Sequence, residues 1–243
     1  MSYNIYNDRI QGGRLSMRFI TAEELVNELL QSGIYDAEGR ITMELNGTSV
    51  EIKENDTVGN ILQEWLGQWL KDNDIYFRPP EGQSFPDFYL QESNEVGLCE
   101  MKAYCAKRTP AFDIANFDSY WKSIELNPRR LDSDYIIFAY SSNDGIIKIE
   151  KIFLKKVWEI TSATKDFPLK CQRKNGQIYN IRPCSFNSKR TKVPAFSSKE
   201  EFLAALYRTV LSHTNKATET RIWLNNVIKK YKNDTGYELI INI

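Results

Sequence analysis

The chain has 243 residues with 32 basic and 32 acidic side chains, so its formal net charge is zero. This length suits one compact domain. The balanced charge argues against a protein that coats nucleic acid with its whole surface, although a basic cleft offset by acidic faces is compatible with it. A lone histidine and four cysteines without a CxxC pair argue against a zinc site. No stretch approaches the roughly 20 apolar residues of a membrane span, and the cysteine usage favours a cytoplasmic location.

The first third of the chain predicts a helix, a hairpin and a second helix. Residues 21–33 have apolar side chains at helical spacing. Residues 39–56 alternate around an Asn-Gly pair, which is typical of a β-hairpin. Asp56 is placed to cap a helix over 57–73, whose apolar stripe includes Trp65 and is either core or a dimer face.

Short strands follow this second helix. Residues 74–78, 85–90 and 95–104 have the composition of strands. Residues 113–126 then predict a helix that an Asn-Pro pair ends, and residues 134–141 predict a buried strand.

The last hundred residues add a strand that begins at 146, a second Asn-Gly hairpin over 168–183, and two amphipathic helices over 197–213 and 219–234, the first capped by Ser198. The order of these elements predicts an α/β fold with a central mixed β-sheet flanked by helices.

Three charged side chains interrupt the apolar strands predicted between 85 and 104. Side chains two residues apart in a strand share a face, so Glu100 and Lys102 point together. Antiparallel pairing would bring Asp87 opposite Glu100. Two carboxylates this close repel unless a cation lies between them, and their oxygen atoms favour Mg²⁺ or Mn²⁺. Such an ion lowers the pKa of a bound water, and Lys102 would orient that water or balance charge on a phosphate.

This pattern resembles the PD-(D/E)xK nuclease superfamily and its restriction-endonuclease-like fold. The motif residues are Pro86-Asp87 and Glu100-Met101-Lys102. The resemblance implies that Asp87 and Glu100 bind the metal ion, with the Met101 carbonyl as an extra ligand, and that Lys102 is the catalytic lysine. Many members carry a further acid on the preceding helix, and Glu64 is the candidate here.

The resemblance covers residues 56–142 and rests on a short, degenerate motif. One alternative is a surface hairpin whose charges are simply solvated, and another is an unrelated α/β protein with a chance motif. Against the solvated hairpin, Glu100 and Lys102 share a predicted face with Val96 and Leu98, which have the character of buried residues.

A basic region lies between residues 165 and 192, where Asp166 is the only acid among eight basic side chains. The tip of its hairpin would enter a groove of DNA, with flanking lysines on phosphates. The other interpretation is a solvated face. We expect DNA contacts from Lys170, Arg173, Lys174, Asn175, Arg182, Lys189, Arg190 and Lys192.

The loop over 78–84 precedes the strand of Asp87. Gly82 permits close approach of the backbone, and Gln83 can donate to a groove edge. In restriction enzymes that resemble the EcoRV branch, a loop in this position approaches the minor groove. A plain Pro-Gly turn explains the stretch equally well.

The resemblance therefore implies a type II restriction endonuclease that hydrolyses double-stranded DNA at a short palindromic site with Mg²⁺, for which Mn²⁺ can substitute. A palindrome matches a homodimer, and no nucleotide cofactor or membrane is expected. One domain over 1–243 would contain a nuclease core at 56–142 and a recognition region at 165–192. In length and general character the chain resembles the group that includes NgoBV and NlaIV, whose target is GGNNCC, although no motif carries this closer likeness. The rivals are a non-specific or structure-specific repair nuclease and a DNA-binding protein without activity.

Overall fold

The computed structural model describes residues 17–53, 57–82, 84–188 and 190–243. Its α-helices are α1 (Ala22–Gln31), α2 (Val58–Asp72), α3 (Phe117–Leu126), α4 (Lys199–Thr214) and α5 (Ala217–Thr235). Two short 3₁₀ helices are η1 (Pro128–Asp132) and η2 (Val157–Ile160). The strands are β1 (Thr42–Leu45), β2 (Thr48–Glu51), β3 (Phe88–Tyr89), β4 (Leu98–Cys105), β5 (Ala115–Asn116), β6 (Asp134–Asn143), β7 (Ile146–Lys156), β8 (Cys171–Lys174) and β9 (Gln177–Ile181).

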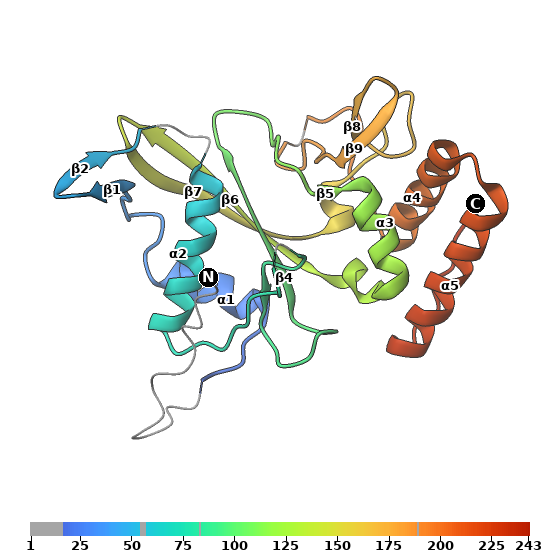
Figure 1. Cartoon of the computed structure of the whole chain (residues 1–243), viewed down its shortest axis with the longest axis horizontal. Coiled ribbons are helices and arrows are strands. Elements are labelled where there is room, and N and C mark those ends of the chain that lie inside the picture. The colour runs from blue at the N-terminus through green and yellow to red at the C-terminus, as the bar shows by residue number, and fades with distance from the viewer. Residues whose placement is uncertain (1–16, 54–56, 83, 189) are drawn as a thin grey trace.

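A four-stranded sheet in the order β3-β4-β6-β7 forms the centre of the molecule (Figure 1). β4 and β6 run parallel, whereas β3 pairs antiparallel with β4 and β7 antiparallel with β6. The predicted mixed sheet is therefore confirmed. A second sheet, β5-β9-β8, lies beside it, and β1 and β2 form a separate hairpin.

Strand alternation divides the central sheet into two faces. Met101 on β4 and Ile136 on β6 belong to a core that includes residues of α1 and α2. Tyr135 and Ile137 on β6 belong to a second core with α3, α4 and α5. Because Glu100 is the register partner of Tyr135, the Glu100 side chain points to the second face.

Local signals in the sequence form caps and turns, of which the Ser198 cap and the two Asn-Gly turns were expected. Thr21 and Glu24 make a complete capping box at α1, and Ser198 accepts a hydrogen bond from the Glu201 N–H at the start of α4. The tip of each hairpin has an asparagine at positive φ, Asn46 at 49° and Asn175 at 51°. Asparagine tolerates this conformation, so both predicted hairpins are confirmed.

Three predicted elements differ from the structure. Residues 74–78 are not a strand, because only isolated bridges join Ile75 to Arg18 and Arg78 to Tyr89. The strand expected over 85–90 is reduced to the two residues of β3.

The helix expected over 113–126 begins only at Phe117. Ala115 and Asn116 pair with β9, and the Asn116 side chain caps α3.

Two expectations about single residues also differ or fall outside the structure. Val96, expected to be buried, is 43% exposed in the turn before β4. Asp56, the expected cap of α2, lies outside the described residues.

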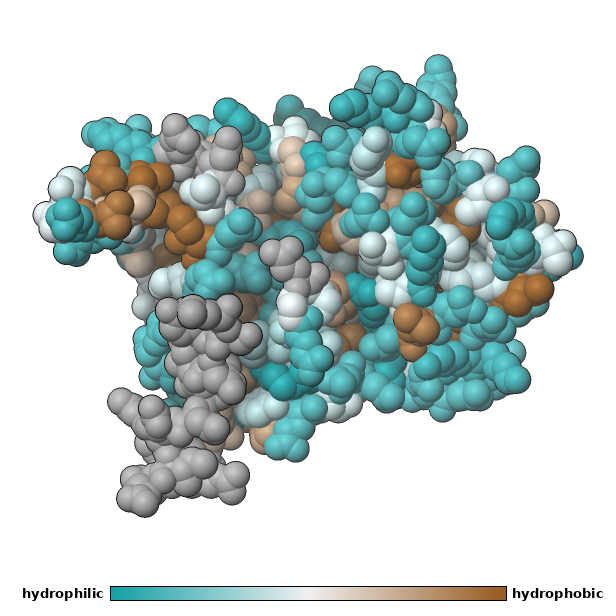
Figure 2. All heavy atoms as spheres, viewed as in Figure 1, coloured by the Kyte–Doolittle hydropathy of each residue, from teal (hydrophilic) through white to brown (hydrophobic). Residues whose placement is uncertain are grey.

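Apolar side chains gather on the outer surface of the β1–β2 hairpin, at the upper left of Figure 2. Met43, Leu45 and Val50 are all more than half exposed there. Trp65 instead packs against the core that includes α1 and α2. Within the described ranges, no helix is long and apolar enough to cross a membrane.

Candidate active site

The register of β3 against β4 places the predicted acids together. Phe88 is opposite Cys99, so the next residue outward, Asp87, lies beside Glu100. The Asp87 N–H donates to Glu100 Oε2 at 3.2 Å. The antiparallel pairing expected from the sequence is therefore confirmed, even though β3 is very short.

Two further bonds complete the arrangement. The Met101 N–H donates to Asp87 Oδ2 at 2.8 Å, and Lys102 Nζ donates to Glu100 Oε1 at 2.7 Å. The structure thus brings Asp87, Glu100, Met101 and Lys102 into direct contact. These bonds fix the orientation of both carboxylates.

Burial makes the charged forms of Asp87 and Glu100 unfavourable. Glu100 is 7% exposed, and burial raises its pKa against the effect of Lys102, while the charge of Asp87 raises it further. Burial also raises the pKa of Asp87. Burial lowers the pKa of Lys102, but the charges of Glu100 and Asp87 outweigh it and the pKa is raised. Two acids and one base share a site from which water is mostly excluded, and a bound cation would relieve the repulsion between the acids.

The available donor atoms fit a hard divalent cation. The N–H and C=O of one strand residue point to the same side, so the Met101 carbonyl faces the edge where Asp87 lies beyond the end of β3. Two carboxylates and a main-chain carbonyl are oxygen ligands of the kind that Mg²⁺ and Mn²⁺ prefer, with waters completing the shell. Among the described residues, no group of three or more His, Cys, Asp or Glu side chains is placed to hold a metal ion without other ligands. The oxygen donors named above suit Mg²⁺ or Mn²⁺, whereas zinc favours cysteine and histidine ligands.

Helix α2, before the motif, carries both the predicted acid Glu64 and a residue that the sequence did not indicate, Gln63. Glu64 is exposed on α2, and its catalytic role stays a prediction. Its neighbour Gln63 hydrogen-bonds to Asp87 and lowers the pKa of that carboxyl, after the larger effects of burial, Lys102 and the Met101 N–H. An amide gives no charge signal in a sequence.

The basic region divides into exposed and internally bonded side chains. Lys174 and Asn175 are exposed at the tip of the β8–β9 hairpin, and Arg190 and Lys192 are exposed beyond β9. Gln83 and Lys189 lie outside the described residues. The exposed set is available to a ligand such as DNA.

Three of the basic residues expected to contact DNA have partners within the chain. Lys170 donates to the Pro183 carbonyl at 2.8 Å, and the Arg173 guanidinium lies 3.8 Å from the centre of the Phe167 ring. Arg182 pairs with Asp113. Their DNA contacts stay predictions, but each side chain already has a structural partner.

Contacts from the second sheet reach the motif. Tyr104 on β4 packs against Phe112 and Phe186 with ring centres 6.4 and 6.2 Å apart. Asp113 follows Phe112, and its charge is one of the smaller causes that raise the pKa of Lys102. The salt bridge between Asp113 and Arg182 therefore links the second sheet to the surroundings of Lys102.

The loop after β4 exposes Lys107 and Arg108, which the sequence interpretation had not selected. They follow Lys102 by five and six residues. Their short distance in sequence from the Glu-x-Lys motif is the signal that could have identified them as candidate phosphate contacts.

An aspartate just before a short strand, beside a longer strand with Glu-x-Lys in a mixed sheet between helices, is typical of the class of PD-(D/E)xK nucleases with a restriction-endonuclease-like fold. The model of the NgoBV restriction endonuclease family matches residues 19–243. The chain therefore belongs to the NgoBV restriction endonuclease family, a family of type II restriction enzymes.

Individual relatives agree with this assignment. The type II restriction enzyme NlaIV of Neisseria lactamica is 35% identical over 218 residues, which cover 88% of this chain and 90% of the relative. The type II restriction enzyme NgoBV of Neisseria gonorrhoeae is 35% identical over 147 residues, which cover 59% of this chain and 84% of the relative. The solved NlaIV restriction endonuclease superposes with a TM-score of 0.88 at 34% identity, covering 93% of this chain and 94% of that one. The resemblance to the group of NgoBV and NlaIV is confirmed.

Proposed function

We propose that the chain, as a type II restriction endonuclease, hydrolyses both strands of DNA at a short palindromic site with Mg²⁺ or Mn²⁺. The observation that carries the proposal is the contact of Asp87 with Glu100 and of Glu100 with Lys102. Divalent ions are a general requirement of type II restriction enzymes, and the oxygen donors of the site fit such an ion.

Each residue has a distinct part in the proposed reaction. Asp87, Glu100 and the Met101 carbonyl hold the ion. When bound, the ion supplies a water of lowered pKa and positive charge against the phosphate. Lys102 stays protonated because its pKa is raised, so its ammonium group donates to the attacking water or to a phosphate oxygen. Gln63 keeps Asp87 oriented.

The exposed basic side chains support a proposed surface for DNA. Lys174 and Asn175 at the hairpin tip would reach a groove, and Lys107 and Arg108 would bind phosphates near the scissile bond. The Asp113–Arg182 pair holds these two regions together. Phosphate contacts supply affinity, whereas base contacts supply the choice of site.

The target sequence is proposed to be GGNNCC, cut by a homodimer whose two-fold axis matches the palindrome. We would compare a synthetic duplex that contains GGNNCC with one in which a single guanine is replaced. Cleavage of the first alone, with equal cuts in both strands, is expected. Equal cleavage of both duplexes would contradict the target and favour a non-specific nuclease.

A calorimetric titration tests the metal site separately. With DNA present, Mg²⁺ or Mn²⁺ should bind the wild-type protein and should bind Asp87→Ala far more weakly. Equal binding by both proteins would place the ion elsewhere.

A further inference from the structure

Behind Glu100 lies a group of polar side chains that the proposed reaction does not yet use. We call it the inner cluster and define it as Tyr120, Arg130 and Tyr135. Tyr135 is the register partner of Glu100 across β4 and β6, so these two side chains lie next to each other on one face. Tyr120 comes from α3 and Arg130 from η1. Both tyrosines are buried.

Three donor atoms of the inner cluster have no hydrogen-bond partner in the part of the chain that the structure describes. They are the hydroxyl groups of Tyr120 and Tyr135 and the Nε atom of Arg130. Buried polar groups without partners are rare, and they destabilise a fold. Phenylalanine would fill the space of either tyrosine without this cost. The two hydroxyl groups therefore suggest a role other than stability.

Electrostatic effects join the inner cluster to the metal-binding residues. After burial, Lys102 and Asp87, the positive charge of Arg130 also acts on Glu100 and lowers its pKa. In turn, Glu100 is among the smaller causes, after burial, that raise the pKa of Tyr120 and Tyr135. All three residues thus lie within electrostatic range of the Glu100 carboxylate.

Arg130 also contacts the segment before β3 that carries the other acid. Its guanidinium lies 3.9 Å from the centre of the Phe85 ring, two residues before Asp87, and 5.7 Å from the ring centre of Tyr120. One side chain therefore packs against the segment of Asp87 and acts on the charge of Glu100.

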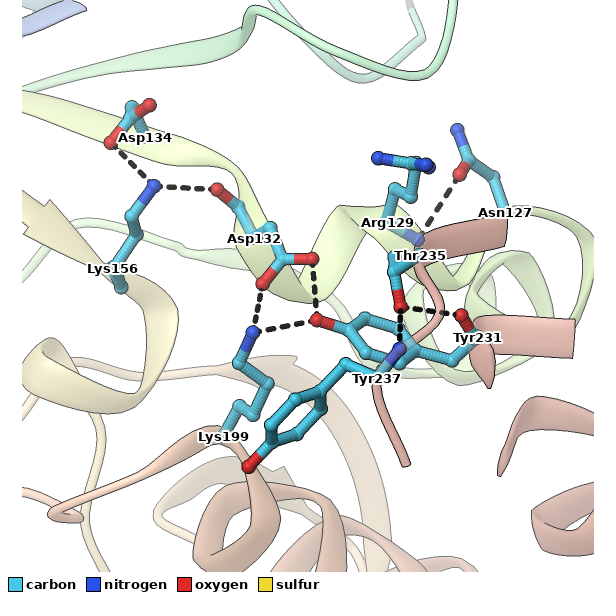
Figure 3. A network of polar contacts seen from close by, with 9 residues as sticks. All are labelled: Asn127, Arg129, Asp132, Asp134, Lys156, Lys199, Tyr231, Thr235 and Tyr237. Atoms are coloured by element: carbon cyan, nitrogen blue, oxygen red, sulfur yellow. Dashed lines mark hydrogen bonds and ion pairs between the residues drawn. The ribbon is translucent and has the colours of Figure 1, made fainter. Parts of the chain in front are cut away.

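The C-terminal helices hold the turn that contains Arg130 (Figure 3). Asp132 pairs with Lys199 of α4 and accepts a hydrogen bond from the Tyr231 hydroxyl of α5 at 2.8 Å. Arg129 donates to the Asp234 carbonyl. Residues on both sides of Arg130 are thus anchored, which limits the positions that Arg130 can take.

The Lys102 ammonium group has three N–H donors, and Glu100 accepts one of them. In the structure it donates to Glu100 at 2.7 Å, whereas the proposed reaction requires its ammonium group at the attacking water or the phosphate. When Lys102 turns to the DNA, Oε1 of the buried Glu100 carboxylate loses the Lys102 hydrogen bond. A bound ion would balance the charge of Glu100, but Oε1 would still need another hydrogen-bond donor to keep the carboxylate oriented.

We propose that the inner cluster positions Glu100 during the reaction. The hydroxyl groups of Tyr120 and Tyr135 and Nε of Arg130 supply hydrogen bonds to the carboxylate, directly or through water, after Lys102 has left it. This inference rests on the proposed function. The three are positioning residues, because they act through Glu100 and do not touch the DNA.

The test uses the full chain with Tyr120→Phe, Tyr135→Phe and the double variant. Tyr207→Phe, at a buried tyrosine of α4, is the matched control. We would measure single-turnover cleavage with Mg²⁺, DNA binding in EDTA, and the melting temperature with and without Mn²⁺. The double variant should melt at or above the wild-type temperature and bind DNA equally well in EDTA. It should cleave at least tenfold more slowly and gain less stability from Mn²⁺, while the control behaves like wild type.

Two results would overturn the inference. The first is wild-type cleavage together with a wild-type response to Mn²⁺ in the double variant. The second is a loss of activity that accompanies an equal loss of melting temperature, because it would mark a structural role. If the wild-type protein neither cleaves DNA nor responds to Mn²⁺, the proposed metal site fails first, and the inner cluster has nothing to position.

Arg130 is tested by two substitutions of similar length. Arg130→Lys keeps the charge and Arg130→Met removes it. We expect Arg130→Lys to retain several times more activity than Arg130→Met at the same DNA affinity in EDTA. An equal loss in both variants would show that the charge of Arg130 does not support Glu100.

Discussion

At the scale of single residues, the site combines groups that are costly to bury. Asp87 and Glu100 are both carboxylates with raised pKa values, and Lys102 offsets only part of their charge. Folding alone would favour neutral side chains at these positions. Binding of a cation, as proposed, would give this arrangement a chemical purpose, because the ion would balance the charge of both acids.

The cost of the ionised Asp87 can be measured as stability. A raised pKa means that the folded protein binds this proton more tightly than the unfolded chain does. The penalty is therefore complete above the folded pKa and fades as the pH falls through it. In EDTA at neutral pH, Asp87→Asn should melt at a higher temperature than wild type, and the gap should narrow towards acid pH. A lower melting temperature at neutral pH would contradict this interpretation of the burial.

Two neighbouring residues of α2 form a natural comparison. Gln63 hydrogen-bonds to Asp87, whereas Glu64 is exposed. In single-turnover cleavage we expect Gln63→Ala to slow the reaction several-fold and Glu64→Ala to have a smaller effect. The reverse order would show that the DNA-bound enzyme recruits Glu64 as the further acid of the family.

At the scale of elements, the sequence predicted those structures that depend on local patterns. The Asn-Gly pairs determine both hairpins through the positive φ of asparagine and glycine. The alternation in β4 correctly placed Glu100 and Lys102 on one face, opposite Met101. These features depend on the alternation of side chains along a strand and on the geometry of turns. Residues adjacent in sequence determine both.

Elements that depend on distant partners were not predictable in this way. β5 shortens the helix expected over 113–126 because β9, more than sixty residues later, pairs with it. Arg130 lies within electrostatic range of Glu100 in a 3₁₀ helix, η1, that α4 and α5 anchor through Asp132. The salt bridge of Arg182 could not be predicted either, because its partner Asp113 is remote in sequence. The positive charge of Arg182 alone suggested a contact with DNA.

The β8–β9 region gives a prediction about DNA affinity. Lys174→Ala and Arg190→Ala should each weaken binding and lower the slope of log affinity against log salt by about one if the contact is to a phosphate. Lys229→Ala, at an exposed lysine of α5, is the control. By contrast, Arg182→Ala should lower the free energy of unfolding by about 0.5–1 kcal/mol, because it removes a partly exposed ion pair with Asp113. Unchanged affinity of the first two variants at every salt concentration would remove the hairpin from the DNA interface.

At the scale of the whole molecule, one sheet with two covered faces supports the site at the edge where β3 ends. The β1–β2 hairpin extends from this body and exposes Met43, Leu45 and Val50 (Figures 1 and 2). Contiguous exposed apolar side chains commonly mark an interface. The proposed palindromic target requires two active sites related by symmetry, so we expect this surface to contact a second copy of the chain.

The dimer can be tested on this surface. Leu45→Glu, at a residue that is 67% exposed, should leave the monomer folded and shift sedimentation from dimer to monomer. Cutting of both strands in one encounter should then give way to nicking. A wild-type protein that sediments as a monomer even with DNA would contradict the homodimer. A dimer that survives Leu45→Glu would place the interface elsewhere.

The most direct measurement is digestion of long phage DNA by the purified protein with Mg²⁺ or with EDTA, beside Lys102→Ala. The central claim is that Asp87, Glu100 and Lys102 form a metal-dependent site for specific DNA cleavage. We expect discrete fragments from the wild-type protein with Mg²⁺ alone, and none from Lys102→Ala, which should still fold and bind DNA. Uncut DNA with every substrate and divalent metal tried, or cleavage by Lys102→Ala at the wild-type rate, would contradict the account.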